Sequence, residues 1–135
     1  MLFSLNCLIS GKTSDDIFNV PIGHFYVNKD YIKVKFAKMN VANLKEILSR
    51  RDEIKEAEIT KMNLWKVELK KDEVNNLSAK DIENHDRSEK MDPMSNLNEY
   101  YSDKKYKKPK KGCLHIFIVP TSTGKCFTSR TRNLQ

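Results

Sequence analysis

The amino-acid sequence predicts an α+β fold built on a sheet of mainly antiparallel strands. Three observations support this class: apolar and polar residues alternate over residues 2–10, a helical apolar period covers residues 40–51, and two later segments have the pattern of buried strands, residues 62–69 and 114–120. A chain of 135 residues suits a single domain. The pattern alone does not order the strands within the sheet.

The N-terminal part predicts a hairpin. Residues 2–10 form its first strand, residues 11–14 a turn and residues 17–22 its second strand, in which Pro21 indicates an edge or a strand end. The same start resembles the apolar core of a signal peptide. No positive charge precedes that core, however, and residues 11–13 make a poor cleavage site, so we favour the strand.

The middle of the chain predicts short extended pieces followed by one helix. Residues 25–37 are spaced like one or two short extended pieces. Residues 40–51 predict the helix, with Asn40 as its N-cap. Its apolar residues recur on one face: Val41, Leu44, Ile47 and Leu48. The charged residues 52–60 either extend this helix or form a loop.

The second half predicts two strands separated by a polar stretch. Leu64, Val67 and Leu69 build a strand around Trp65, whereas residues 72–92 are polar and only weakly periodic. The last strand ends at Pro120. Residues 121–135 show no apolar pattern and predict a flexible basic tail, so we expect one domain over residues 1–120.

The net charge of +7 is unevenly distributed. Residues 1–100 hold 16 Lys and Arg against 17 Asp and Glu, whereas residues 101–135 hold 9 against 1. Affinity for polyanions is therefore expected near the C-terminus. The three cysteines form no Cys-x-x-Cys pair, which predicts buried free thiols at Cys7 and Cys113 rather than a zinc site. No apolar run has the length of a membrane span.

The strand at residues 62–69 and the closing strand resemble the N-terminal domain of Crinkler proteins, in particular its fungal form. In that family a Leu-x-Leu-Trp-Lys-Val-type strand takes the place of the Leu-Phe-Leu-Ala-Lys motif of the oomycete members. The resemblance also includes the helix and residues 91–101, and it spans residues 1–120. The chain departs from the family pattern at an insertion near residues 24–39 and at a lysine-rich loop, residues 104–111.

The resemblance implies a ubiquitin-like β-grasp fold, with one main helix packed on a mixed sheet of four to five strands. It also implies a secreted effector that is moved into host cells, and many family members act in host nuclei and lack an evident signal peptide. Enzymatic activity in the family resides in domains downstream of this one. With 15 residues after Pro120, we expect no enzyme, no cofactor and no catalytic residues in this chain.

Two sets of site residues follow from the resemblance. Candidates for the translocation motif are Leu64, Trp65, Lys66 and Val67. The closing-strand motif is His115, Ile116, Phe117, Ile118, Val119 and Pro120. In the structural alternative, Leu64 and Val67 are core residues and Trp65 covers a sheet face, and this alternative is compatible with docking through that face.

The lysine-rich segment is the strongest signal that does not depend on the family. Six lysines fall within eight residues: Lys104, Lys105, Lys107, Lys108, Lys110 and Lys111. Pro109 prevents a helix, so we expect an extended cationic segment. It predicts a nuclear-import signal read by an import receptor, or a phosphate-contacting patch, and the alternative is a solvated loop. A small nucleic-acid-binding protein is thus a second functional hypothesis, beside binding of a host protein.

Other site chemistry finds no support in the sequence. His24, His85 and His115 lack the spacing of metal ligands. Residues 11–13 and 123–126 depart from the phosphate-loop pattern. A lone histidine on a strand, such as His115, is more often structural than catalytic.

Overall fold

The computed structural model describes residues 2–75 and 77–123. The strands are β1 (Phe3–Ile9), β2 (Phe18–Ile22), β3 (Phe25–Val27), β4 (Lys33–Lys35), β5 (Ile59–Lys70), β6 (Glu89–Lys90) and β7 (Cys113–Thr123). The α-helices are α1 (Val41–Ser49), α2 (Asp52–Glu56) and α3 (Ala79–Glu83). Four short 3-10 helices join them: Ser14–Asp16, Phe36–Lys38, Lys71–Glu73 and Leu97–Glu99.

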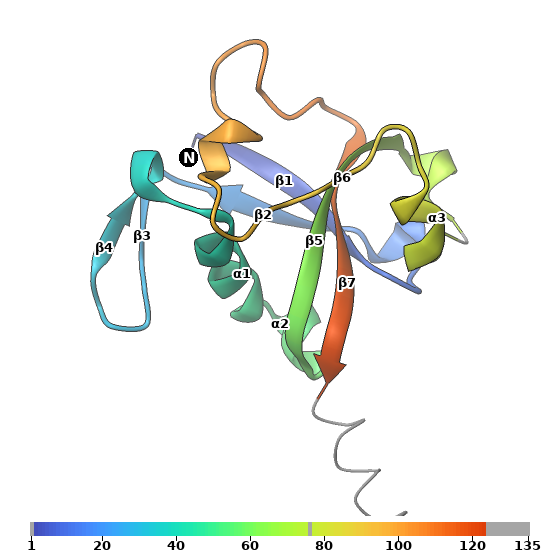
Figure 1. Ribbon diagram of the computed structural model, residues 1–135, viewed down its shortest axis with the longest axis horizontal. Coiled ribbons are helices and arrows are strands. Elements are labelled where there is room, and N and C mark those ends of the chain that lie inside the picture. Colours follow the sequence, from blue (N-terminus) through green and yellow to red (C-terminus); the bar gives the residue numbers. More distant parts are fainter. Residues whose placement is uncertain (1, 76, 124–135) are drawn as a thin grey trace, which may run out of the picture.

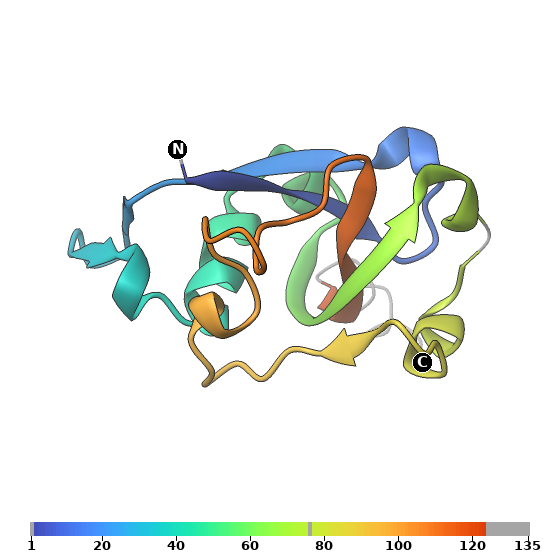
Figure 2. The same cartoon turned by 90° about the horizontal axis from the view of Figure 1, so that it is seen from above.

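The main sheet has five strands in the order β2-β1-β7-β5-β6 (Figures 1 and 2). β1 and β7 run parallel, and the other neighbours are antiparallel. β3 and β4 form a separate two-stranded hairpin. These findings confirm the α+β class with one main helix and a mixed sheet. The fifth strand, β6, has only two residues and was not predicted, because residues 72–92 carry little apolar pattern.

The N-terminal hairpin forms as predicted. In β1 the side chains of Phe3, Leu5 and Cys7 are buried while those between them are partly exposed, which is the alternation of a strand with one face in the core. β2 is an edge strand, in agreement with the position of Pro21. The apolar start of the described chain is therefore a strand of the sheet.

The main helix also forms as predicted. The Asn40 side chain accepts a hydrogen bond from the Asn43 backbone N–H (2.8 Å), and the Asn43 side chain accepts one from the Asn40 N–H (2.9 Å). α1 ends at Ser49, so residues 52–60 do not extend it. They form the separate helix α2, which buries Ile54, and then enter β5.

Two buried clusters lie on the sheet. The larger one joins α1 and α2 to β1, β2, β5 and β7, and it includes Leu5, Leu44 and Leu64. The smaller one joins β1, β5 and β7 to Val74 and α3, and it includes Phe117 and Ile82. α3 lies at one end of the molecule and the β3–β4 hairpin projects at the other (Figures 1 and 2).

The closing strand does not end at Pro120. β7 continues to Thr123, with Pro120 paired to Met62 and Ser122 to Lys61. The register shifts beside Pro120, and such an irregularity accommodates a residue that has no backbone N–H. The expected tail boundary at residue 121 is thus wrong for residues 121–123. Its remainder, residues 124–135, lies outside the described residues, and so does Cys126.

Candidate functional site

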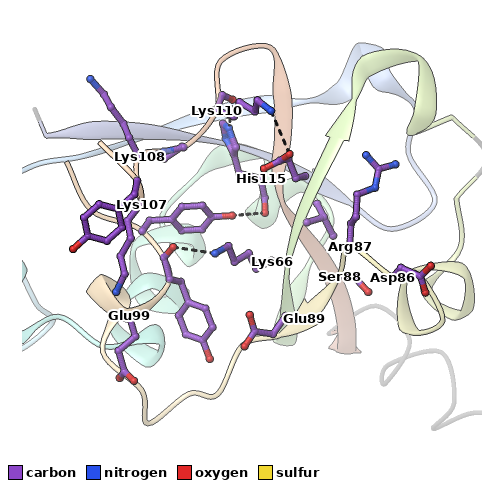
Figure 3. A pocket seen from close by; sticks show the side chains of 16 residues that line it. Lys66, Asp86, Arg87, Ser88, Glu89, Glu99, Lys107, Lys108, Lys110 and His115 are labelled. Atoms are coloured by element: carbon purple, nitrogen blue, oxygen red, sulfur yellow. Dashed lines mark hydrogen bonds and ion pairs between the residues drawn. The ribbon is translucent and has the colours of Figure 1, made fainter. Parts of the chain in front are cut away.

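The structure brings the lysine-rich segment and part of the strand motif to one groove. This groove, of about 540 Å³, lies between β5 and the loop that precedes β7 (Figure 3). Lys66, Lys107, Lys108, Lys110 and His115 line it. A second hollow, of about 750 Å³, shares Lys108 and Lys110, so the lysine-rich loop forms a wall of both.

The four residues of the strand motif have different surroundings. Leu64 and Val67 are buried in the two clusters, and Trp65 is half-buried against the smaller one. This arrangement agrees with the structural alternative for the motif, in which the apolar members support the sheet. Of these four residues, only Lys66 places a charged group, its ammonium, in the groove.

Lys66 is held by the segment before the lysine-rich loop. Its Nζ donates a hydrogen bond to the Tyr100 carbonyl oxygen (3.1 Å) and lies 5.0 Å from the centre of the Tyr101 ring (Figure 3). A hydrogen bond and a cation–π contact restrict this side chain to one place. Lys66 therefore links the Trp65 strand to residues 100–101.

The lysine-rich segment is a folded loop, and the expectation of an extended segment is wrong. The Lys107 N–H donates to the Lys104 carbonyl (2.9 Å), which closes a turn, and the Ser102 N–H donates to the Lys107 carbonyl (3.2 Å). The Lys107 Nζ donates to the Asn98 carbonyl (3.2 Å). Backbone and side-chain bonds to nearby carbonyls thus bend the segment despite its charge. The other five lysines are exposed.

His115 anchors this loop to the sheet. Its Nδ1 accepts a hydrogen bond from the Asn6 N–H (2.9 Å), so the proton of the neutral ring is on Nε2, which donates to the Lys110 carbonyl (2.7 Å). The ring is buried, and burial lowers the pKa of His115 below its usual 6.5 even though Lys110 and Glu68 favour the charged form. This histidine has a structural role.

Tyr101 completes the anchor. Its hydroxyl donates to the His115 carbonyl (2.9 Å), and its ring packs edge-on against the imidazole. Burial raises the pKa of Tyr101 far above its usual value, so the hydroxyl stays a donor. The loop, the closing strand and Lys66 are therefore connected through one buried tyrosine.

The groove is lined by side chains of both charge signs. Lys107, Lys108 and Lys110 come from the loop, and the lining also includes the Arg87 guanidinium and four carboxylates: Glu68, Asp86, Glu89 and Glu99. Lys110 lies 3.6 Å from Glu68, and both side chains are exposed. The carboxylates oppose a polyanion inside the groove, whereas the exposed Lys104, Lys105 and Lys111 are not among its lining residues.

The structure assigns a packing role to the remaining predicted residues. Ile116, Phe117 and Ile118 are buried in the clusters, and Cys7 and Cys113 are buried free thiols. Burial raises the pKa of the Cys7 thiol, which keeps it protonated. Within residues 2–75 and 77–123, no three His, Cys, Asp or Glu side chains are placed to hold a metal ion. No helix in this part of the chain has the length and apolar character of a membrane span.

Sequence reasoning missed the partners that hold His115 in place. Asn6 and His115 meet across 109 residues of sequence, and Tyr101 bonds to the His115 carbonyl. The adjacent tyrosines Tyr100 and Tyr101 were the only local signal, since two aromatic residues in a polar stretch indicate burial.

The fold and the groove define an α+β protein with a basic loop, and no metal-binding cluster is present among the described residues. The family model of the Crinkler effector protein N-terminal domain matches residues 3–119. The chain therefore belongs to the Crinkler effector family and carries its N-terminal domain, an effector delivery domain with no known catalytic role. Comparison with curated proteins and with solved structures gave no match.

Proposed function

We propose that this chain is the non-enzymatic delivery and binding domain of a secreted Crinkler-type effector of the fungal type, translocated into host cells and then into host nuclei. The single observation that supports the nuclear step is the lysine-rich loop, which exposes five of its six lysines around one turn. Family membership supports secretion and translocation. The partner is a host protein, with an import receptor for the loop.

We further propose that the fold is the ubiquitin-like β-grasp. The first two strands form a hairpin, the main helix follows, and the first and last strands pair in parallel at the centre of the sheet. The β3–β4 hairpin between β2 and α1 is then the insertion near residues 24–39. In this proposal the insertion is an addition to the fold whose strands do not join the main sheet.

The translocation motif acts, in this proposal, through Lys66. Its apolar neighbours Leu64 and Val67 are buried and Trp65 is half-buried, so a partner reaches the motif mainly through the groove. A groove lined by charges of both signs suits a protein segment that also carries both signs. Binding through an open sheet face is not supported at this strand, because both of its faces contribute to buried clusters.

The test of the nuclear step is localisation in plant cells. The chain is fused to two fluorescent proteins in tandem, which makes passive entry into nuclei slow, and all six loop lysines are changed to Gln. We expect the wild type to accumulate in nuclei and the variant to remain outside. Equal distributions of the two would overturn the import proposal.

A matched control separates charge number from charge position. Six lysines that are exposed elsewhere are changed to Gln together: Lys12, Lys29, Lys38, Lys55, Lys61 and Lys80. None of these side chains contributes to a hydrogen bond or ion pair among the described residues. We expect this variant to remain in nuclei, because the proposed import signal lies in the lysine-rich loop.

The second candidate is non-specific nucleic-acid binding by the loop. The observation that favours it is the exposed set Lys104, Lys105 and Lys111, next to Tyr106 with 79% of its surface exposed. If this is the function, the logarithm of the affinity for DNA falls steeply with the logarithm of salt concentration, and the six-Gln variant flattens the slope. A shallow slope in the wild type would exclude this candidate.

A further inference from the structure

The β3–β4 hairpin presents apolar side chains to solvent. The described residues expose six large hydrophobic side chains, and four of them belong to this hairpin: Phe25 (48%), Val27 (43%), Tyr31 (90%) and Ile32 (58%). Apolar side chains gathered on one small element mark an interaction site. The packing of the domain does not explain them, because each of these four is exposed.

The hairpin has one packed face and one open face. Tyr26 and Val34, which pair across the strands, pack against the larger cluster. Phe25 and Val27 point the other way, and each pairs with a lysine, Lys35 and Lys33 respectively. The open face therefore combines apolar and cationic side chains. The Lys33 Nζ lies 4.2 Å from the centre of the Phe25 ring, which holds the two together.

The tip of the hairpin is rigidly shaped. The Asn28 side-chain oxygen accepts hydrogen bonds from the backbone N–H groups of Asp30 and Ile32, both at 2.9 Å. These bonds hold Tyr31 in the left-handed region, with φ of 63°, which is uncommon for a bulky residue. Tyr31 and Ile32 thus form a fixed apolar tip.

The hairpin is fastened to α1 from behind. The Tyr26 hydroxyl donates to Glu46 (3.1 Å), and the Lys29 backbone N–H donates to the same carboxylate (2.7 Å). Arg50 pairs with Glu46 at 2.8 Å and offsets its charge. The open face and tip are therefore held in one orientation relative to the domain.

We propose that the open face and tip of this hairpin bind an anionic lipid surface, with Phe25, Val27, Tyr31 and Ile32 in the interface and the lysines at the headgroups. Charge complementarity supports this occupant. Residues 24–39 carry four lysines, Lys29, Lys33, Lys35 and Lys38, against the single carboxylate of Asp30. Apolar insertion and attraction of lysines to anionic headgroups are the two contributions that hold peripheral proteins on membranes.

The shape of the hairpin supports a flat partner. It projects from one end of the molecule and is two strands wide, so the rest of the domain leaves the hairpin accessible to a planar surface (Figures 1 and 2). A second copy of the chain is disfavoured, because two such faces would bring four lysines against four. The hairpin includes no residue of the lysine-rich loop or of the strand motif, so this binding is separate from the proposed function.

The test is co-sedimentation of the full chain with vesicles of phosphatidylcholine alone and of equal parts phosphatidylcholine and phosphatidylserine. We expect binding to the mixed vesicles, weakened at least about tenfold by the joint changes Phe25→Ser, Val27→Ser and Ile32→Ser. Changing Lys29, Lys33, Lys35 and Lys38 to Gln should weaken binding to the mixed vesicles about fivefold for each lysine removed. All these positions are exposed, so circular dichroism should show an intact fold in every variant.

The six-Gln loop variant is the control for non-specific charge. It retains binding to the mixed vesicles if the hairpin is the contact, and the emission of a Tyr31→Trp variant shifts to shorter wavelength on those vesicles. The proposal is overturned if neither vesicle binds the chain, which would leave the face to an acidic protein. It is equally overturned if the loop variant loses binding while the hairpin variants keep it. Neither result bears on nuclear import.

Discussion

The lysine-rich loop and the β3–β4 hairpin are both basic, yet they present their lysines in different ways. Loop lysines line a groove whose lining also includes carboxylates, and His115 and Tyr101 anchor the loop to the sheet. The hairpin sets its lysines among exposed apolar side chains, and Asp30 is the one carboxylate within residues 24–39. Burial and neighbouring side chains, more than net charge, thus decide which partner each region suits.

The largest expected effect concerns the anchor of the loop. His115→Ala leaves the Asn6 N–H and the Lys110 carbonyl without partners, which should lower the free energy of unfolding by about 3 kcal/mol. The urea midpoint measures this loss. His24→Ala, at an exposed histidine just before the hairpin, is the matched control and should change little. Equal midpoints for the two variants would refute the anchoring role.

The second prediction is a loss of stability in acid through the same histidine. The folded pKa of His115 lies below 6.5, so the unfolded chain binds a proton first and stability falls as the pH drops below about 6.5. The charged ring has a proton on Nδ1 and can no longer accept from Asn6. Melting temperatures from about pH 7.5 to pH 5 measure this slope. His115→Gln should flatten it, and an unchanged slope would assign the effect to other groups.

The third prediction separates the hairpin from the loop. Tyr26→Phe removes the hydroxyl that donates to Glu46 and accepts from the Asn43 side chain at 2.8 Å, at a cost of about 1 kcal/mol. Hydrogen exchange should then quicken in residues 25–35 and stay unchanged in residues 104–111. Faster exchange in both segments would show that the two regions are coupled.

The smallest expected effect is at the exposed ion pair of the groove. Lys110→Gln removes the 3.6 Å contact with Glu68, and both side chains are more than half exposed, so stability should change by less than about 0.5 kcal/mol. Chemical denaturation of the variant and of the wild type measures this difference in the free energy of unfolding. A larger loss would mean that the Lys110 side chain, and not only its carbonyl, holds the loop.

Local patterns predicted much of the framework. The alternation in residues 2–10, the N-cap at Asn40 and the apolar face of α1 each depend on residues close in sequence, and each is confirmed. The continuation of β7 past Pro120 was not predictable. It depends on a shift in register between β5 and β7 beside Pro120, and a local pattern does not show such a shift. The two-residue strand β6 has too few residues to produce a pattern.

The candidate sites were less predictable than the framework. The six lysines were evident in the sequence, but the turn at Lys104–Lys107 and the bond from His115 to Asn6 depend on contacts that local patterns do not encode. The open face of the hairpin was hidden for a similar reason. Apolar residues in residues 25–37 suggest burial, and only the structure separates the packed Tyr26 and Val34 from the exposed Phe25 and Val27.

The most direct test of separate roles for the two basic regions is the nuclear fraction of tandem fluorescent fusions in plant cells. One variant has the six loop lysines changed to Gln, and the other has Lys29, Lys33, Lys35 and Lys38 changed to Gln. We expect that only the loop variant loses nuclear accumulation. Equal loss in both variants, or loss in the hairpin variant alone, would contradict it.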